Sequence, residues 1–271
     1  MPIISLENAC YSYPCGKEAL SSVSLSIEKG ECVAVLGANG SGKSTLMKVI
    51  SGLAALSSGS ARVMGLVLGA SADRIIHRYV SVAFQNPDNQ FVSTVLKEDA
   101  CFSLLNFGYS RSDALSAALS SLASVGLEGF GDRNPYSLSG GQKEKAVLAS
   151  ILAIDPEIIL FDEAFSMLDP SSRAEMMEIV CRLRKEGRTI IYITHDAESA
   201  QIADRVILMK EGRIVRDGSK YDVLTDSESL YSASVLPPEC VRISDELRAR
   251  GIDIGKHLDE EMLREALCRL A

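Results

Sequence analysis

Hydrophobic and polar positions along the chain follow two different periods, and together they predict buried strands that alternate with helices. Mostly apolar runs, typical of strands buried on both faces, cover 32–36, 79–84, 158–161 and 189–194. Apolar residues recur at helical spacing after the first run, over about 95–126, and up to Ile154. This succession predicts an α/β domain built around a parallel sheet.

The two ends of the chain have patterns of their own. Apolar residues alternate with polar ones at 3–6 and 23–27, which indicates a small antiparallel sheet. After about residue 226 two prolines interrupt the chain, and short helices are expected over 244–250 and from Asp259 onward. The last helix carries Leu263, Ala266, Leu267 and Leu270 on one side. We expect a main domain at 1–226, with a helical insertion at about 90–155, and a small module at 227–271 that serves packing or dimerisation.

A glycine-rich loop connects the first buried run to the helix that follows it. Its glycines let successive backbone N–H groups turn inward, and the start of the helix adds unpaired donors and a positive dipole end. Lys43 is expected to reach the β- and γ-phosphates of a nucleotide, Ser44 to bind Mg²⁺, and Thr45 to support the phosphate cradle. Residues 37–44 match the full phosphate-loop spacing G-x-x-x-x-G-K-[ST], which argues against a turn that only connects a strand to a helix. The expected phosphate-binding residues are Gly37, Asn39, Gly40, Ser41, Gly42, Lys43, Ser44 and Thr45.

Polar side chains follow three of the other buried runs, where each strand is expected to end. Asp162 suits Mg²⁺ through a water, and Glu163 can polarise a water for attack on the γ-phosphate. His195 is expected to contact the γ-phosphate, and Gln85 to reach Mg²⁺ or the attacking water. Taken alone, each would be an ordinary strand-end or loop residue. The phosphate loop upstream favours the catalytic interpretation, with Ser44, Gln85 and Asp162 as the metal ligands.

A second serine- and glycine-rich helix start lies far along the chain, at Ser139, Gly140, Gly141 and Gln142. It predicts a second anion-binding nest. One chain with one nucleotide cannot easily use both nests, so we expect a dimer in which the second nest of each chain closes over the nucleotide of the other. Asp169, in the turn at 166–170, can bridge to the opposite subunit.

Composition narrows the classes of partner. The net charge of -8 and the low isoelectric point argue against nucleic acid as the main ligand. No apolar run approaches the ~18 residues of a membrane span, and the N-terminus lacks the pattern of a signal peptide. Seven scattered cysteines, without a C-x-x-C pair, are read as reduced thiols rather than a zinc site or a disulfide framework. We expect the chain to stay in the cytosol and to meet a membrane only through a partner.

Together these motifs resemble the ATP-binding cassette ATPases over residues 1 to about 225. The matching features are the phosphate loop, Gln85, the signature segment Leu138-Ser139-Gly140-Gly141-Gln142, Asp162-Glu163, Asp169 and His195. The resemblance implies a RecA-like parallel core with an antiparallel β subdomain and a helical subdomain. It also implies ATP hydrolysis with Mg²⁺ in a head-to-tail dimer with two shared ATP sites. Either Tyr11 and Tyr13 only pack the sheet, or Tyr13 stacks on the base; the resemblance favours the second interpretation.

A narrower resemblance is to the ATPase subunits of energy-coupling factor importers, including the cobalt and nickel group. It rests on 84–90, on 166–170 and on the C-terminal tail, whereas Phe165 and Glu144-Lys145 depart from that group's pattern. It implies vitamin or transition-metal ion import at the cytoplasmic face of the cell membrane. The implied partners are a second ATPase subunit, identical or different, a transmembrane coupling protein and an integral-membrane solute-binding subunit.

Two alternatives share the catalytic motifs. One is the ATPase of another importer or exporter class, which only the tail and the stretch from Asn86 to Gln90 separate from the first interpretation. The other is an ATPase of the same superfamily acting on ribosomes or DNA. The single cassette, the short helical insertion and the acidic composition disfavour that second alternative.

Overall fold

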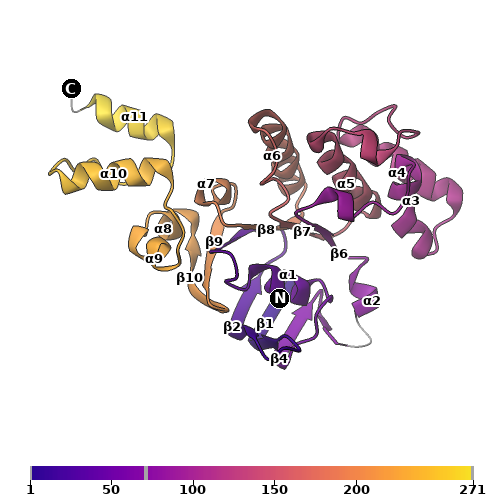
Figure 1. The fold of residues 1–271 in the computed structure, drawn as a ribbon, viewed down its shortest axis with the longest axis horizontal. Coiled ribbons are helices and arrows are strands. Elements are labelled where there is room, and N and C mark those ends of the chain that lie inside the picture. The colour runs from indigo at the N-terminus through magenta and orange to yellow at the C-terminus, as the bar shows by residue number, and fades with distance from the viewer. Residues whose placement is uncertain (1, 70–72, 270–271) are drawn as a thin grey trace.

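The computed structural model describes residues 2–69 and 73–269, and Figure 1 shows two sheets with helices around them. The larger sheet has six strands in the order β10-β9-β3-β8-β7-β6. Its strands are β3 (Cys32–Leu36), β6 (Val80–Ala83), β7 (Ile158–Asp162), β8 (Thr189–Thr194), β9 (Arg205–Lys210) and β10 (Arg213–Ser219). All neighbouring pairs are parallel except β10 with β9. The predicted α/β fold with a parallel core sheet is confirmed.

The side chains of β3 alternate between two hydrophobic cores, because successive residues of a strand point to opposite faces. Cys32, Ala34 and Leu36 pack in one core with α5 (Gly140–Ile154) and α6 (Pro170–Lys185). Val33 and Val35 pack in the other core with α1 (Lys43–Ile50) and the smaller sheet. A strand covered on both faces needs an unbroken apolar run, which is the pattern found at 32–36.

The smaller sheet is antiparallel, with the strand order β2-β1-β4-β5. Its strands are β1 (Ile4–Ser12), β2 (Glu18–Ile27), β4 (Ser58–Val63) and β5 (Leu66–Val67). The sheet expected from the first alternating segments is present, with longer strands than predicted. It lies below α1 in Figure 1. The carbonyl oxygen of Ala19, near the start of β2, lies beside Gly42 at the N-cap of that helix.

Three helices lie close together toward one end of the molecule (Figure 1). They are α3 (Leu96–Asn106), α4 (Arg111–Ser124) and α5. Ser110 caps α4, with its hydroxyl oxygen accepting from the backbone N–H of Asp113 at 3.1 Å. Small and medium side chains, including Ala100, Leu104, Ala114 and Ala118, fill the space between these helices.

The C-terminal part contains α8 (Lys220–Leu224), α9 (Ser227–Ser232), α10 (Glu239–Ala249) and α11 (Glu260–Cys268). Leu230, Ala233 and Val235 pack in the same core as β3, whereas α10 and α11 lie beyond that core (Figure 1). The predicted start of the helix over 244–250 is wrong, because α10 begins five residues earlier and Pro238 stands at its N-cap. Proline is tolerated where a helix starts, since it needs no N–H there.

The remaining helices are short. They are α2 (Asp73–Ile76), α7 (Ala197–Ala200) and the 3₁₀ turns η1 (Pro87–Asn89) and η2 (Pro135–Ser137). The carboxylate of Asp259 caps α11 as predicted, while the expected contribution of Leu270 lies outside the described residues. Within 2–69 and 73–269, no helix is both long and apolar enough to cross a bilayer.

Candidate nucleotide site

The predicted site residues follow adjacent parallel strands, whose carboxyl ends lie at one edge of the larger sheet. Leu36 at the end of β3 pairs with Thr194 at the end of β8, and Asp162 at the end of β7 pairs with Ile193. The phosphate loop, Glu163 and His195 therefore begin side by side although they are far apart in the sequence. Ligands bind at this edge in open α/β sheets.

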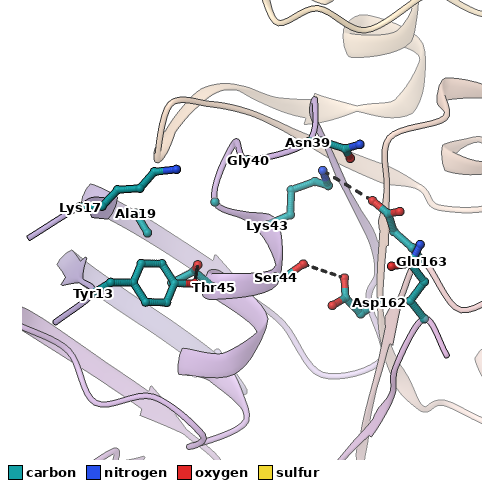
Figure 2. A pocket seen from close by; sticks show the side chains of 12 residues that line it. Tyr13, Lys17, Ala19, Asn39, Gly40, Lys43, Ser44, Thr45, Asp162 and Glu163 are labelled. Atoms are coloured by element: carbon teal, nitrogen blue, oxygen red, sulfur yellow. Dashed lines mark hydrogen bonds and ion pairs between the residues drawn. The ribbon is translucent and has the colours of Figure 1, made fainter. Parts of the chain in front are cut away.

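A pocket of about 370 Å³ opens at this edge, and Figure 2 shows its side chains. It is lined by Tyr13, Lys17, Ala19, Asn39, Gly40, Gly42, Lys43, Ser44, Thr45, Gln85, Asp162 and Glu163. Ten of these twelve were predicted as site residues, all except Lys17 and Ala19. No motif marks those two, because only the position of the β1–β2 connection beside the phosphate loop brings them to the pocket.

The glycines of the phosphate loop are required by close backbone contacts. Gly42 has a φ of 105°, and a Cβ atom there would lie 2.6 Å from the carbonyl oxygen of Ala19. A Cβ at Gly37 would lie 2.4 Å from the carbonyl oxygen of Met209 and 2.6 Å from Ser41 Oγ. Gly37 and Ser41 do not line the pocket. Their contribution is to the conformation of the loop, because Gly37 packs closely against Ser41 and the backbone of Met209. The loop therefore has to be glycine-rich before any ligand is considered.

Lys43 is almost completely buried and lies at the centre of the loop. Its ammonium group donates hydrogen bonds to the carbonyl oxygens of Gly37 at 2.7 Å and Ala38 at 3.0 Å. It also lies 3.8 Å from Glu163 Oε1 (Figure 2). Burial lowers the pKa of Lys43, and the carboxylates of Glu163 and Asp162 oppose that shift. The loop thus presents one cation where a phosphate chain would be cradled.

Ser44 and Asp162 bring a hydroxyl and a carboxylate together from different elements. Ser44 Oγ donates to Asp162 Oδ1 at 3.1 Å, as Figure 2 shows. Burial raises the pKa of Asp162, while the hydrogen bond from Ser44 lowers it. Gln85 lines the same pocket. Hydroxyl, carboxylate and amide oxygens are the ligands that Mg²⁺ prefers, so this donor set fits the predicted metal.

Glu163 lies between two cavities. Its Oε2 atom lies 3.2 Å from Nδ1 of His195, on the side opposite Lys43. His195 is half-exposed and lines a second cavity of about 250 Å³, together with Arg173 and Tyr192. The histidine therefore contacts the carboxylate that faces the nucleotide pocket, whereas it does not line that pocket itself.

The two tyrosines of β1 and its connecting loop have different environments. Tyr11 packs against the core of the smaller sheet, whereas Tyr13 lines the nucleotide pocket. The Tyr13 hydroxyl shares a hydrogen bond of 3.0 Å with Thr45 Oγ1. The rings meet edge to face, with their centroids 5.1 Å apart. Of the two, Tyr13 is the ring available to a ligand.

The signature segment does not face the nucleotide pocket of its own chain. Ser139 caps α5 and forms a capping box with Gln142, whose backbone N–H donates to Ser139 Oγ at 3.3 Å. None of the residues 139–142 lines the pocket. The donors at this helix start are thus directed elsewhere, with Ser139 and Gly140 exposed.

Asp169 is exposed and caps α6, accepting backbone N–H bonds from Ser171 and Ser172. The Ser172 hydroxyl also donates to Asp169 Oδ2 at 2.7 Å, and these bonds lower the pKa of Asp169. Asp169 does not line the pocket either. In the single chain, its carboxylate is occupied by the first turn of its own helix.

Comparison with known proteins agrees with this geometry. The sequence profile described as ABC transporter matches residues 20–166. The chain is 39% identical over 271 residues to the energy-coupling factor transporter ATP-binding protein EcfA1 of Lacticaseibacillus paracasei, covering 99% of this chain and 98% of that one. It is 39% identical over 254 residues to EcfA2 of Methanospirillum hungatei, covering 93% of this chain but only 64% of that protein's length.

Two solved structures are similar as well. CbiO1 from Clostridium perfringens, part of the ABC transporter complex CbiONQ, aligns over 91% of this chain and 99% of its own, with a TM-score of 0.77 and 29% identity. The cassette MJ0796, in a dimeric post-hydrolysis state bound to ADP and Pi, aligns over 80% of this chain and 98% of its own, with a TM-score of 0.72 and 29% identity. The chain belongs to the ABC transporter family and, within it, to the ATP-binding proteins of energy-coupling factor transporters, and it is an ATPase.

Proposed function

We propose that this chain powers a membrane importer of the energy-coupling factor type by closing with a second ATPase subunit around ATP and opening after hydrolysis. The observation that carries the proposal is the contact series Lys43, Glu163 and His195 at the nucleotide pocket. This series places a cation, a carboxylate and an imidazole where a γ-phosphate would be held. The transported solute is a vitamin or a transition-metal ion, as in the importer group that the chain resembles.

ATP lies along the pocket from Tyr13 to Glu163. The base stacks on the Tyr13 ring at the end of the pocket that Thr45 also lines. The phosphates follow the backbone N–H groups of the loop, where Lys43 neutralises the β- and γ-phosphates. Lys17 and Ala19 form the wall opposite Asp162 and Glu163 (Figure 2).

Ser44 and Asp162 would hold Mg²⁺ on the side of the pocket where their side chains meet. Ser44 would bind the ion directly, Asp162 would hold it through a water, and Gln85 would complete the set from its loop. When bound, the ion would supply positive charge that offsets the charge developing on the phosphates in the transition state. The hydroxyl and the carboxylate are already within hydrogen-bond distance, so little reorganisation is needed to bring these two groups together.

Hydrolysis uses Glu163 as the general base. The carboxylate accepts a proton from the water that attacks the γ-phosphate, and it faces the pocket from the end of β7. His195 holds that carboxylate from behind through Nδ1. The imidazole fixes the orientation of the base, and it would contact the γ-phosphate once the two subunits close.

The second subunit supplies what one chain lacks. The signature segment places the positive end of α5, whose first N–H groups have no intrahelical acceptor, away from its own pocket. In a head-to-tail pair, Ser139, Gly140, Gly141 and Gln142 of each chain would face the γ-phosphate bound by the other. Asp169 meets the opposite subunit at the same interface. ATP thus holds the two chains together through its γ-phosphate, and hydrolysis removes this contact.

The membrane partner docks in a groove of about 320 Å³ between α3, α5 and the loop after β6, which we call the docking groove. Gln90 and Val92 line it from the loop, and Phe102, Val147 and Ile151 line it from the helices. Val92 is 61% exposed and Phe102 is 48% exposed, so the groove presents apolar surface to a partner. Its shape and chemistry suit short helices of a transmembrane coupling protein, which in turn holds an integral-membrane solute-binding subunit at the cytoplasmic face of the membrane.

Purification of the tagged chain from gently solubilised native membranes, followed by mass spectrometry, tests this proposal. We expect a transmembrane coupling protein and a small integral-membrane protein to accompany the chain, and the second protein to identify the solute. Recovery of a conventional permease pair would assign the chain to another transporter class. Recovery of ribosomal or DNA-repair proteins without a membrane protein would contradict the transport function.

A further inference from the structure

The loop from Phe84 to Gln90, the glutamine loop, is closed on itself by side-chain hydrogen bonds. Gln90 Oε1 accepts from the backbone N–H of Phe84 at 2.8 Å, and Gln90 Nε2 donates to the carbonyl oxygen of Val82 at 3.1 Å. Asn86 Oδ1 accepts from the backbone N–H of Asp88 at 3.0 Å and caps η1. These bonds connect the two ends of the loop and shape its tip, so it moves as one body.

One ion pair connects this loop to the signature helix. Asp88 Oδ1 lies 2.7 Å from Nζ of Lys143, which directly follows Gln142 in the first turn of α5. The side chain of Lys143 is only 17% exposed, whereas that of Asp88 is 46% exposed. The Lys143 side chain is therefore largely shielded from water, and its ammonium group contacts the loop.

The two elements that the pair joins have different roles in the proposed cycle. Gln90 at the end of the glutamine loop and Val92, two residues beyond it, line the docking groove, and Gln85 near the start of the loop lines the nucleotide pocket. On the other side of the pair, the first turn of α5 carries Gly140 and Gly141 of the signature segment. If a docked partner displaced the loop, the ion pair between Asp88 and Lys143, with its 2.7 Å contact, would transmit the movement to the signature segment.

We propose that Asp88 and Lys143 are positioning residues that transmit movement of the glutamine loop to the signature segment. A partner bound in the docking groove thereby controls the position of the signature segment relative to the nucleotide bound by the other subunit. This inference rests on the proposed function for the identity of the partner, whereas the link between loop and helix belongs to this chain alone. Neither residue touches the nucleotide pocket, so neither is catalytic.

The energetics of the pair suit transmission rather than stability. A pair with one exposed partner adds little to the free energy of unfolding, since water and salt screen it. Variants of either residue should therefore fold. The pair formed by Lys97 and Asp132 is a matched control, because it joins α3 to a neighbouring loop at 2.5 Å without involving the glutamine loop or the signature segment.

A charge exchange in the assembled transporter tests the inference. The chain is purified with its membrane partners as wild type, as Asp88→Lys, as Lys143→Asp and as the double variant, and solute uptake into ATP-loaded vesicles is measured. Each single variant should lose at least about fivefold in uptake, and the double variant should return to within about twofold of wild type. Single variants at wild-type uptake, or a double variant no better than the worse single one, would overturn the inference. If Asp88 contacted the membrane partner directly, the double variant would take up no more solute than the worse single variant.

Hydrogen exchange of the isolated chain tests the same link without any partner. Asp88→Asn should speed exchange in the first turn of α5, and Lys143→Gln should speed exchange within the glutamine loop, while Asp132→Asn should affect neither segment. Exchange that stays local to each substitution would overturn the inference. If the wild-type chain associates with no membrane protein, the transport function fails, but these exchange data still decide whether the pair couples the two elements.

Discussion

His195 Nδ1 lies 3.2 Å from Glu163 Oε2, and this contact joins the residues that follow two adjacent parallel strands. Glu163 has a φ of 51°, a left-handed conformation that is uncommon for glutamate. Its backbone N–H donates to the carbonyl oxygen of Ile193 at 3.0 Å, which fixes this turn against β8. The sheet thus holds the carboxylate in place at some cost in backbone strain, as is frequent at functional sites.

Replacement of His195 by alanine should lower the turnover of ATP by about one to two orders of magnitude, because Glu163 then loses the group that orients it. The KM for ATP should stay within about threefold, since His195 does not line the nucleotide pocket. Steady-state hydrolysis by the assembled transporter measures both. His257→Ala is the matched control, because that imidazole bonds the nearby carbonyl oxygen of Ile254 and does not line the nucleotide pocket. Equal losses in both variants would remove His195 from the mechanism.

The ring of Tyr13, rather than its hydroxyl, should determine the affinity for ATP. Tyr13→Phe keeps the ring and removes the bond to Thr45 Oγ1, so KM should change by less than about threefold. Tyr13→Ala removes the stacking surface and should raise KM by about tenfold. Tyr11→Phe serves as the control, because Tyr11 packs in the core. If Tyr13→Ala binds ATP as tightly as wild type, the base lies elsewhere.

The two signature glycines should respond differently to an added methyl group. A Cβ at Gly141 would lie 2.5 Å from Ser172 Oγ, whereas a Cβ at Gly140 would meet nothing within 4 Å. Gly141→Ala should therefore lower the free energy of unfolding by about 1–3 kcal/mol, and Gly140→Ala should leave it nearly unchanged. Denaturant unfolding of the isolated chain measures both.

A second substitution tests the cause. Adding Ser172→Gly to Gly141→Ala removes the clashing hydroxyl and should recover part of the lost stability, after allowance for the separate cost of Ser172→Gly. The hydroxyl is also a donor to Asp169, so Ser172→Gly alone measures that cost. No recovery in the double variant would show that the contact at Gly141 does not limit stability.

Glu144 should make the stability of the fold depend on pH. Its side chain is 3% exposed in α5, and burial raises its pKa from 4.5 to about 8. The unfolded chain releases this proton near pH 4.5 but the folded chain only near pH 8, so the folded state is favoured at low pH and loses stability as the pH rises between these values. Each pKa unit corresponds to about 1.4 kcal/mol. The effect is complete above about pH 8.

Glu144→Gln removes the ionisable group and keeps the shape of the side chain. Its melting temperature should exceed that of wild type by an amount that grows from pH 5 to pH 8, the range over which the wild-type penalty develops. Thermal unfolding in buffers across this range measures the difference. Glu128→Gln, at an exposed position, should give no such trend. A constant difference at all pH values would show that Glu144 is ionised in the folded state.

The parts of the fold that sequence reasoning predicted depend on local patterns. The run at 32–36 is apolar because β3 is buried on both faces, and the phosphate-loop motif fixes a strand, a loop and a helix within a few residues. Ser110 and Asp113 likewise predict a helix start that the structure confirms. In each case the chemistry that decides the conformation lies within a few positions of the chain.

Other features depend on contacts between distant segments, which no short motif records. Lys17 reaches the nucleotide pocket only because the smaller sheet packs beside the phosphate loop. Gly141 needs to be glycine because of Ser172, which lies on a different helix. The departure at Lys145 also has a tertiary explanation, since its ammonium pairs with Glu175 on α6. The sequence predicts too late a start for helix α10, because two prolines are typical of a break in the chain, whereas Pro238 stands at the N-cap of this helix.

The most direct test of the account is the association state of Glu163→Gln with and without ATP. Glutamine keeps the shape of the side chain but cannot accept the proton, so the variant should bind ATP and fail to turn it over. Sedimentation of the variant, alone or mixed with its partner ATPase, should show monomers without nucleotide and a stable dimer with Mg²⁺ and ATP. The central claim is that bound ATP holds two chains together until hydrolysis, with Glu163 as the base, lets them separate. Hydrolysis at the wild-type rate by the assembled Glu163→Gln transporter would contradict this claim. A variant that stays monomeric at saturating ATP would contradict it as well.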